Sequence, residues 1–200
     1  LSLHDALPIS SANRIYVQRP IAEKFIAELT KAMSAFVVGR GTDATTTLGA
    51  SVSIKERNKI AELVDQSIAA GAKVETGGKT PDGPGAFYPA TVLSVAKDNP
   101  ILNHEIFGPV APVVIFDTDV EGIALANDTE FGLISYVFSS DLARAIRTAE
   151  AMESGMVAIN KGVISDPAAP FGGVKQSGLG REGGFDGIHE FLQTKYIGVQ

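Results

Sequence analysis

Glu105 and Phe107 stand two residues apart and are followed by Gly108 and Pro109. Alternate residues of an extended segment point the same way, so this carboxylate and this aromatic ring would lie side by side. A carboxylate can accept hydrogen bonds from both hydroxyls of a ribose, and an aromatic ring can lie along a flat heterocycle such as nicotinamide. On the pattern alone, the commoner alternative is a surface glutamate followed by a core phenylalanine at the entrance to a strand.

A second candidate residue, Ser165, lies in the stretch 160–184. Its hydroxyl can donate a hydrogen bond to the carboxylate of a ligand. The run Ser165-Asp166-Pro167 is also good turn chemistry, so a turn-forming serine is the alternative. Asp166 would place a negative charge beside such an anion site. Both interpretations of Ser165 stay open.

Phe171 precedes a cluster of six glycines, which are Gly172, Gly173, Gly178, Gly180, Gly183 and Gly184. Such a density indicates backbone angles barred to other residues, or backbone pressed close against a neighbour. Residues 178–183 spell GxGxxG, but a dinucleotide-binding fingerprint needs an apolar strand before it and an acid about 20 residues after it. The preceding residues 174–177 are too short and polar for that strand. We therefore predict tight turns, with Lys175, Arg181 and Glu182 as solvated or locally paired polar residues.

Strands and helices alternate along the chain, which indicates an α/β fold with a mainly parallel sheet. Apolar residues recur every four positions from Ile21 to Met33, as on one face of a helix. Residues 113–116 form the continuous apolar run of a buried strand, and Asp141 suits the N-cap of a helix. The predicted helices are residues 20–36, 55–70, 120–127 and 142–153, and the predicted strands or extended segments are residues 14–18, 72–75, 87–95, 113–116, 133–139, 156–160 and 194–199.

Bulk composition narrows the function classes. The chain has 200 residues, of which 44% are hydrophobic and 20% charged, with a net charge of −6. The negative charge argues against nucleic acid or an anionic membrane as a partner, and no apolar run could span a bilayer. The sequence contains no cysteine, so it has neither a disulfide framework nor a thiolate metal site. His104 and His189 form no ligand pattern, and we expect them to be surface or packing residues.

Two long motifs carry a family resemblance that runs from about Ala12 to the C-terminus. Residues 170–182 read PFGGVKQSGLGRE and residues 104–110 read HEIFGPV. Both resemble signatures of the aldehyde dehydrogenases, and GVIS at residues 162–165 resembles the succinate-semialdehyde dehydrogenase branch. The resemblance implies the α/β catalytic domain of that family, with a C-terminal strand at residues 194–199 that enters the sheet of a partner subunit in a homodimer or homotetramer.

The resemblance also implies roles for individual residues. Glu105 would contact the nicotinamide ribose of NAD or NADP and Phe107 its ring, Ser165 would hold the distal carboxylate of the substrate, and Phe171 would form a wall of the aldehyde tunnel; an aromatic plug over the glycine turns is the alternative for Phe171. In the family a cysteine thiolate attacks the aldehyde and a glutamate base activates water. Both groups lie upstream of Ser11 there, so no catalytic residue is predicted in this chain, which we expect to be inactive alone.

The N-terminus departs from this resemblance. Residues 2–9 match an in-frame translation of a common sequencing-library adapter, so we interpret residues 1–10 as a non-native segment, with a divergent natural N-terminus as the alternative. Residues 11–173 would then be a partial catalytic domain and residues 174–200 a C-terminal oligomerisation segment of a cytoplasmic enzyme. Two other functions stay open: another branch, such as one acting on glutarate semialdehyde or a neutral aldehyde, and a non-catalytic oligomerisation module.

Overall fold

The computed structural model describes residues 12–200, which divide into two units between Leu125 and Ala126. The interpretation of residues 1–10 as a non-native segment lies outside the described residues. The division falls within the stretch predicted as one partial catalytic domain, and the domain boundary predicted after Gly173 stays a prediction. Each unit is described by itself below.

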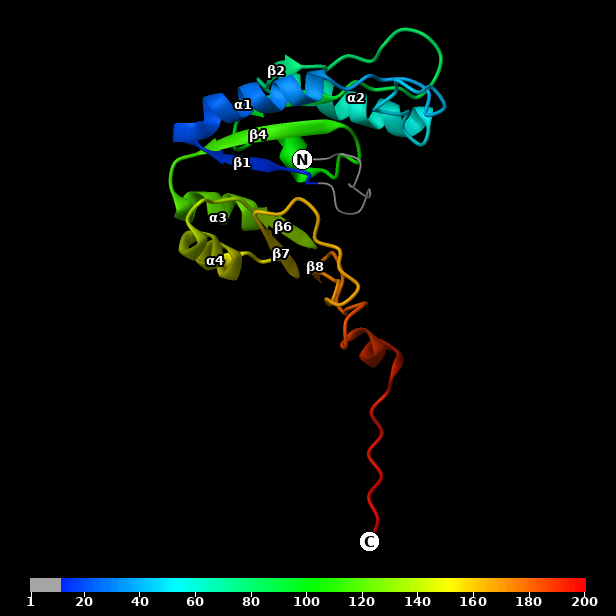
Figure 1. Ribbon diagram of the computed structural model, residues 1–200, viewed down its shortest axis with the longest axis vertical. Helices are drawn as coiled ribbons and strands as arrows, with labels where there is room; N and C mark the ends of the chain where they lie inside the picture. Colours follow the sequence, from blue (N-terminus) through cyan, green and yellow to red (C-terminus); the bar gives the residue numbers. More distant parts are fainter. Residues whose placement is uncertain (1–11) are drawn as a thin grey trace. The chain divides into compact units, whose positions relative to one another are not determined.

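A four-stranded sheet organises the first unit, with the strand order β1-β4-β3-β2 (Figure 1). The central strand β4 (Val110–Phe116) pairs in parallel with β1 (Ile15–Gln18) and β3 (Thr91–Val95), while β2 (Lys73–Thr76) pairs antiparallel with β3 at one edge. The first five residues of β4 are all buried, which explains its continuous apolar sequence. The predicted α/β fold with a mainly parallel sheet is confirmed.

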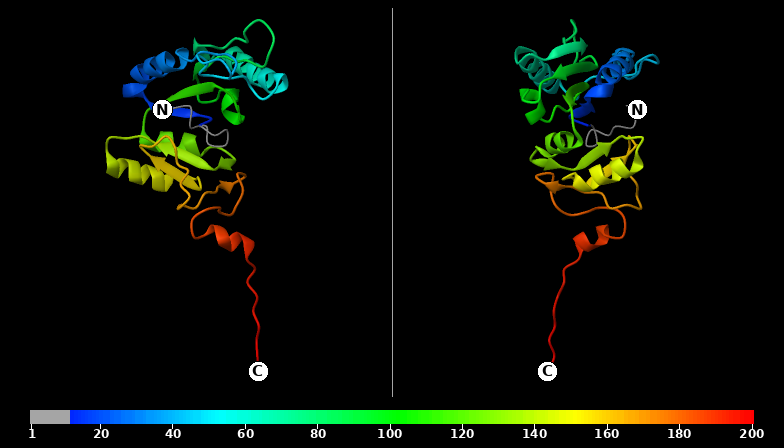
Figure 2. Two further views of the ribbon diagram at one scale, coloured as in Figure 1. Left: turned by 45° about the vertical axis from the view of Figure 1, so that its right-hand side comes forward. Right: turned by 90° about the vertical axis from the view of Figure 1, so that its left-hand side faces the viewer.

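The two long helices cover opposite faces of this sheet, and the right-hand view of Figure 2 shows the strands between them. The helix α1 (Arg19–Ser34) has Pro20 in its first turn, where a missing N–H costs nothing. The helix α2 (Ile54–Ala69) is capped by Ser53, whose side chain accepts a hydrogen bond from the amide of Glu56. Because neighbouring strand residues point to opposite faces, Val92 packs in the core beneath α1 and Leu93 in the core beneath α2.

A buried polar pair ties α2 to the segment that leads toward Glu105. The hydroxyl of Ser67 donates to Asn99 Oδ1 at 2.8 Å, and Asn99 Nδ2 donates back to the Ser67 carbonyl at 3.1 Å. Asn99 Oδ1 also accepts from the Ile101 amide, which caps the short 3₁₀ helix η3 (Pro100–Asn103). Both polar side chains are therefore satisfied although both are buried.

The second unit contains a parallel strand pair with a helix against it, and a shorter antiparallel pair. Between β6 and β7 the helix α4 begins at the N-cap Asp141, whose side chain accepts from the Arg144 amide as predicted. The helix α3 carries the chain into this unit from the first. The elements are α3 (Asp119–Asn127), β5 (Phe131–Gly132), β6 (Ile134–Val137), α4 (Leu142–Ala151), β7 (Met156–Ile159), β8 (Val174–Lys175) and the 3₁₀ helix η4 (Gly187–Phe191), with β6 parallel to β7 and β5 antiparallel to β8.

The prediction of a strand at residues 194–199 is wrong for the single chain. After η4 the chain continues to the C-terminus without regular secondary structure (Figure 1). An apolar, β-prone segment becomes a strand only when a neighbouring strand takes up its backbone hydrogen bonds, and no other part of residues 12–200 pairs with it. None of the helices within residues 12–200 is long and apolar enough to cross a membrane.

The buried Tyr88 predicts a decline of stability in alkali. Its side chain is 1% exposed, and burial, with a smaller effect from the charge of Asp65, raises the pKa of Tyr88 to about 12. An unfolded tyrosine titrates near pH 10. The unfolded state therefore loses this proton first, and the free energy of unfolding should be unaffected below pH 10 and fall between pH 10 and 12, by up to about 1.4 kcal/mol per pH unit.

Tyr88→Phe should reduce the fall in the free energy of unfolding between pH 10 and 12, measured by urea unfolding at several pH values in this range. It should leave stability at pH 7 nearly unchanged, because the Tyr88 hydroxyl has no well-formed hydrogen bond among residues 12–200 although Thr91 lies nearby. Tyr196→Phe is the control, since that side chain is 92% exposed. An unchanged slope in Tyr88→Phe would exclude Tyr88 as the responsible group.

Candidate functional site

The loop at residues 104–109 presents Glu105 and Phe107 on either side of a buried anchor. Ile106 is 2% exposed and packs in the core formed with α2. Glu105 is exposed and Phe107 is 53% exposed. The exposure alternates as predicted, but the segment is not extended at Phe107, whose φ is +46°. Phe107 is also not the core residue that the alternative required. Within residues 12–200 the Glu105 carboxylate makes no hydrogen bond or ion pair, so it is open to a ligand.

A single asparagine amide holds the backbone on both sides of Glu105. Asn13 Nδ2 donates to the His104 carbonyl at 2.6 Å, and Asn13 Oδ1 accepts from the Ile106 amide at 2.9 Å. Asn13 lies two residues before β1, which pairs with β4. The sequence segment 12–14 and the loop at 104–109 are thus joined across more than 90 positions.

Phe107 adopts backbone angles that are rare for a residue with a side chain. Its φ is +46°, in the left-handed region that costs about 1–2 kcal/mol for such a residue. The next residue, Gly108, lies so close to α2 that an added Cβ would stand 2.4 Å from Ile60 Cδ1. The buried Ile106, the Asn13 amide and this close approach together enforce the strained turn, which directs the Phe107 ring outward.

The loop that carries Ser165 also starts at an asparagine, Asn160, which has a left-handed backbone. Asn160 has φ +52°, and its amide bonds both backbone groups of Ser139, at 2.9 Å from the Ser139 amide to Oδ1 and 2.8 Å from Nδ2 to the Ser139 carbonyl. Asp166 Oδ1 accepts from the Ala168 amide at 2.9 Å, so a turn does form here, but it is made by Asp166 and lies at residues 166–168. Ser165 itself is exposed, which leaves its hydroxyl available for a ligand as well.

The glycine-rich segment folds into the predicted tight turns. Phe171 and Glu182 exchange backbone hydrogen bonds at 2.7 and 2.8 Å, and Phe171 is half-buried. Arg181 Nη1 donates to the carbonyls of Gly173 and Gly180, each at 2.7 Å. Positive φ occurs at four glycines of the cluster, which are Gly178, Gly180, Gly183 and Gly184. The rejection of a dinucleotide fingerprint agrees with the preceding strand β8, which has two residues only.

Lys175 is locally paired, as predicted for the polar residues of this segment. Its ammonium forms an ion pair with Glu153 at 2.6 Å and donates to the carbonyls of Asn127 and Thr129. Asn127 is the last residue of α3 and Thr129 lies two residues beyond it, where a cation is favoured by the helix dipole. The role of Lys175 is therefore structural.

The predicted site residues fall into two pairs. Glu105 and Phe107 share one loop of the first unit, and Ser165 and Phe171 share one segment of the second unit. His104 and His189, which we expected to be surface or packing residues, are both exposed. Among residues 12–200 no group of three histidine, aspartate or glutamate side chains could hold a metal ion.

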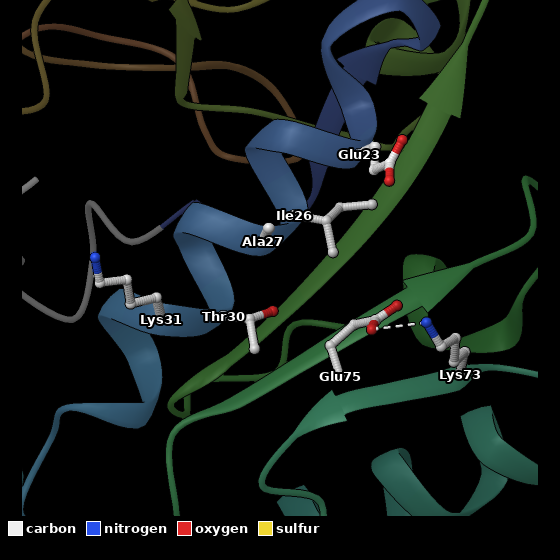
Figure 3. Close-up of a pocket in the computed structure, with 7 residues that line it drawn as sticks. All are labelled: Glu23, Ile26, Ala27, Thr30, Lys31, Lys73 and Glu75. Carbon is white, nitrogen blue, oxygen red and sulfur yellow. Dashed lines mark ion pairs between the residues drawn. The ribbon is translucent and has the colours of Figure 1, made fainter.

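A shallow groove between α1 and β2 carries none of these residues (Figure 3). It is lined by Ile26 and Thr30 from α1 and by Lys73 and Glu75 from β2, among others. Burial alone would raise the pKa of Glu75, but hydrogen bonds from Lys73 and Ser94 outweigh it and lower that pKa. Lys73 and Glu75 form an ion pair at 2.9 Å, so the two charged side chains that β2 contributes to the groove are paired with each other.

Sequence reasoning missed the two asparagines that position the candidate loops. Asn13 follows Ala12, where the family resemblance begins, and Asn160 begins the stretch 160–184, but no local pattern shows which distant backbone an amide will bond. The available signal was chemical, since asparagine alone among short side chains carries a donor and an acceptor that match a peptide group. Asn160 also tolerates the left-handed backbone that it adopts.

Comparisons with known proteins agree with this architecture. The sequence pattern of the aldehyde dehydrogenase family matches residues 9–197. The chain is 50% identical, over 95% of its length, to the succinate-semialdehyde dehydrogenase of Paenarthrobacter nicotinovorans, and 44% identical, over 93% of its length, to the glutarate-semialdehyde dehydrogenase of Pseudomonas putida. It spans 42% and 38% of the lengths of these curated relatives.

Solved structures give the same result. The succinate-semialdehyde dehydrogenase from Burkholderia pseudomallei superimposes with a TM-score of 0.87 at 44% identity, covering 90% of this chain and 38% of that one. A betaine aldehyde dehydrogenase from Staphylococcus aureus in complex with NAD+ superimposes with a TM-score of 0.88 at 40% identity, covering 94% and 39%. The fold is that of an α/β protein of the dehydrogenase class. The chain belongs to the aldehyde dehydrogenase family.

Close backbone packing around the Phe171 segment predicts that Gly155→Ala is destabilising. An added Cβ at Gly155 would lie 2.1 Å from the Gly172 carbonyl oxygen, so the segment after Phe171 must shift. We expect a loss of about 1–3 kcal/mol in the free energy of unfolding, the usual cost of overpacking. Gly49→Ala is the matched control, because nothing lies within 4 Å of its added Cβ. Equal urea midpoints for both variants would contradict the close approach.

Proposed function

We propose that this polypeptide serves the NAD(P)-dependent oxidation of succinate semialdehyde to succinate. It contributes one wall of the cofactor site through Glu105 and Phe107, and one loop of the substrate site through Ser165 and Phe171. The observation that carries the proposal is the outward display of Glu105 and Phe107 around the buried Ile106, in a chain that belongs to the aldehyde dehydrogenase family.

The residues at the loop 104–109 suit a nicotinamide ribose. The exposed Glu105 carboxylate has free lone pairs for the two ribose hydroxyls, and the Phe107 ring is held outward by a backbone that does not need to rearrange on binding. When bound, NAD or NADP supplies the hydride acceptor. The chain's own contribution is to orient that ring against Phe107 and to fix the ribose through Glu105.

The residues of the segment 160–171 suit an aldehyde with a distal carboxylate. The exposed Ser165 hydroxyl can donate to that carboxylate, and the half-buried Phe171 can line the path of the aliphatic chain. The nearby Asp166 accepts a backbone hydrogen bond at Oδ1, which directs part of its charge into the turn. The names of two relatives, a succinate-semialdehyde and a glutarate-semialdehyde dehydrogenase, support a semialdehyde that carries an acid group.

The sequence contains no cysteine. If the reaction proceeds by attack of a thiolate on the aldehyde carbon, that thiolate comes from outside these 200 residues. We therefore propose that the 200 residues alone bind the reactants weakly and do not turn them over.

A hybrid enzyme tests the function and the role of Ser165. In this hybrid, residues 12–200 replace the matching stretch of the Paenarthrobacter nicotinovorans relative, which supplies the remaining groups. We expect it to reduce NAD or NADP with succinate semialdehyde. Ser165→Ala should lower kcat/KM for succinate semialdehyde about tenfold or more, because a hydrogen bond to a charged group is lost. It should leave kcat/KM for butyraldehyde, which lacks the carboxylate, unchanged.

Ser140→Ala is the control for this experiment, since Ser140 is an exposed serine of the same unit. An equal loss for both aldehydes in Ser165→Ala would show that Ser165 does not contact the carboxylate. A hybrid that prefers glutarate semialdehyde would assign the chain to that branch, where one methylene is worth only about 1–3 kcal/mol of discrimination. A folded, oligomeric hybrid without activity on any aldehyde would favour the non-catalytic oligomerisation module.

We also propose that residues 194–199 pair with a second copy of the chain in a homodimer or homotetramer. Tyr196 and Val199 are more than nine-tenths exposed, and such an apolar, β-prone segment is stabilised by the sheet of a partner. Ile197→Pro should reduce the sedimentation coefficient of the 200-residue chain, because proline removes an N–H from any intermolecular ladder. Ile197→Val is the matched control. The same oligomer in both variants would rule out pairing through this segment.

A further inference from the structure

We propose that Asn13 is the positioning residue of the cofactor wall, acting through the backbone on both sides of Glu105. This inference rests on the proposed function of Glu105 and Phe107. Asn13 does not reach a ligand itself in this assignment. It sets the direction of the two side chains that do, by bonding the His104 carbonyl at 2.6 Å and the Ile106 amide at 2.9 Å.

The position of Asn13 makes its amide a rigid support. Asn13 lies two residues before β1, and Ile15 of β1 is in register with Val113 of β4. The strand β4 starts at Val110, directly after the loop 104–109. The amide and the C-terminal end of the loop are therefore both fixed to the same pair of hydrogen-bonded strands, so the loop is held from two directions.

The other contacts of the loop do not fix Glu105. The buried side chain of Ile106 anchors one residue, and the approach of Gly108 to Ile60 fixes the end of the turn. His104 and Glu105 are exposed, so packing does not restrain the peptide between them. One Asn13 hydrogen bond holds this peptide through the His104 carbonyl, and the other holds the following peptide through the Ile106 amide, next to the left-handed Phe107.

The chemistry of the site requires a primary amide. One atom must accept from the Ile106 amide while its neighbour donates to the His104 carbonyl. Asparagine provides both groups in one plane. An ionised aspartate would keep the acceptor but place a second acceptor against the His104 carbonyl, and alanine would provide neither.

Two measurements on the full 200-residue chain test the proposal. The first is hydrogen exchange of the Ile106 amide by NMR. We expect Asn13→Ala to accelerate exchange about tenfold or more relative to the wild type, since a hydrogen bond of this kind is worth about one decade. Asn58→Ala is the control, because Asn58 is exposed on α2 and bonds only its neighbour Arg57 in the described chain.

The second measurement is titration with NAD+ and with NADP+, followed through the Phe107 ring signals. Asn13→Ala should raise the dissociation constant of the nucleotide about tenfold, with signals of residues in α1 unchanged.

Asn13→Asp should give a pH dependence of Ile106 exchange that a general loss of stability would not produce. Near pH 4 part of the new carboxyl is protonated and can donate to the His104 carbonyl, so Ile106 protection should approach the wild-type value. When the carboxyl ionises, its second oxygen is repelled by the His104 carbonyl oxygen and the side chain turns away from the loop, so Ile106 protection should fall as the pH rises to 7. The wild type, which contains the same ionisable neighbours His104 and Glu105, provides the baseline.

The outcomes separate this inference from the proposed function. Equal Ile106 exchange in the wild type and Asn13→Ala overturns the positioning role, as does a flat pH profile in Asn13→Asp. A wild-type chain whose Phe107 signals do not move with either nucleotide overturns the assignment of the cofactor wall. If Asn13→Ala does not fold, the reversible loss of protection in Asn13→Asp decides the question.

Discussion

The structure depends on one interaction that recurs, the side-chain amide of asparagine bonded to backbone on a distant segment. A primary amide carries a donor and an acceptor like a peptide group, so it can form hydrogen bonds with backbone groups that have no neighbouring strand. Such amides bond backbone groups in loops and at the ends of helices. The amides and the distant backbone they hold are Asn13 with residues 104 and 106, Asn99 with residue 67, Asn127 with residues 151 and 153, and Asn160 with residue 139.

The Asn13 amide explains how Glu105 and Phe107 can be exposed while the loop that carries them is held in place. Glu105, Phe107 and Ser165 lie on loops, where packing alone would leave them mobile. The loop of Glu105 is held by Asn13, and the loop of Ser165 begins at Asn160. Where two backbone segments are in direct contact, the residue is a glycine, because a side chain would keep the segments apart. Gly155 beside the Gly172 carbonyl is an example. Binding can then occur without a large loss of loop entropy.

Local patterns predicted the elements but not the interactions between them. The helices α1 and α2 follow from apolar spacing, and the cap at Asp141 follows from residue type, because each depends on neighbours within a few positions. The turns of the glycine segment were also predictable from composition. The partner of Asn13 was not, because the bond spans 91 positions and exists only once β1 and β4 have paired. The prediction of a strand at residues 194–199 was wrong for the single chain for a related reason, since a β-prone sequence does not specify whether a partner strand is present.

Whether Asn13 affects the cofactor through Glu105 can be decided by a double-mutant cycle. NAD+ affinity would be measured by NMR titration for the wild-type chain, Asn13→Ala, Glu105→Gln and the double variant. If the amide serves to aim the carboxylate, removing Asn13 should weaken binding much less in the Glu105→Gln background than in the wild type. Full additivity of the two losses would contradict the account, because Asn13 would then influence binding independently of Glu105.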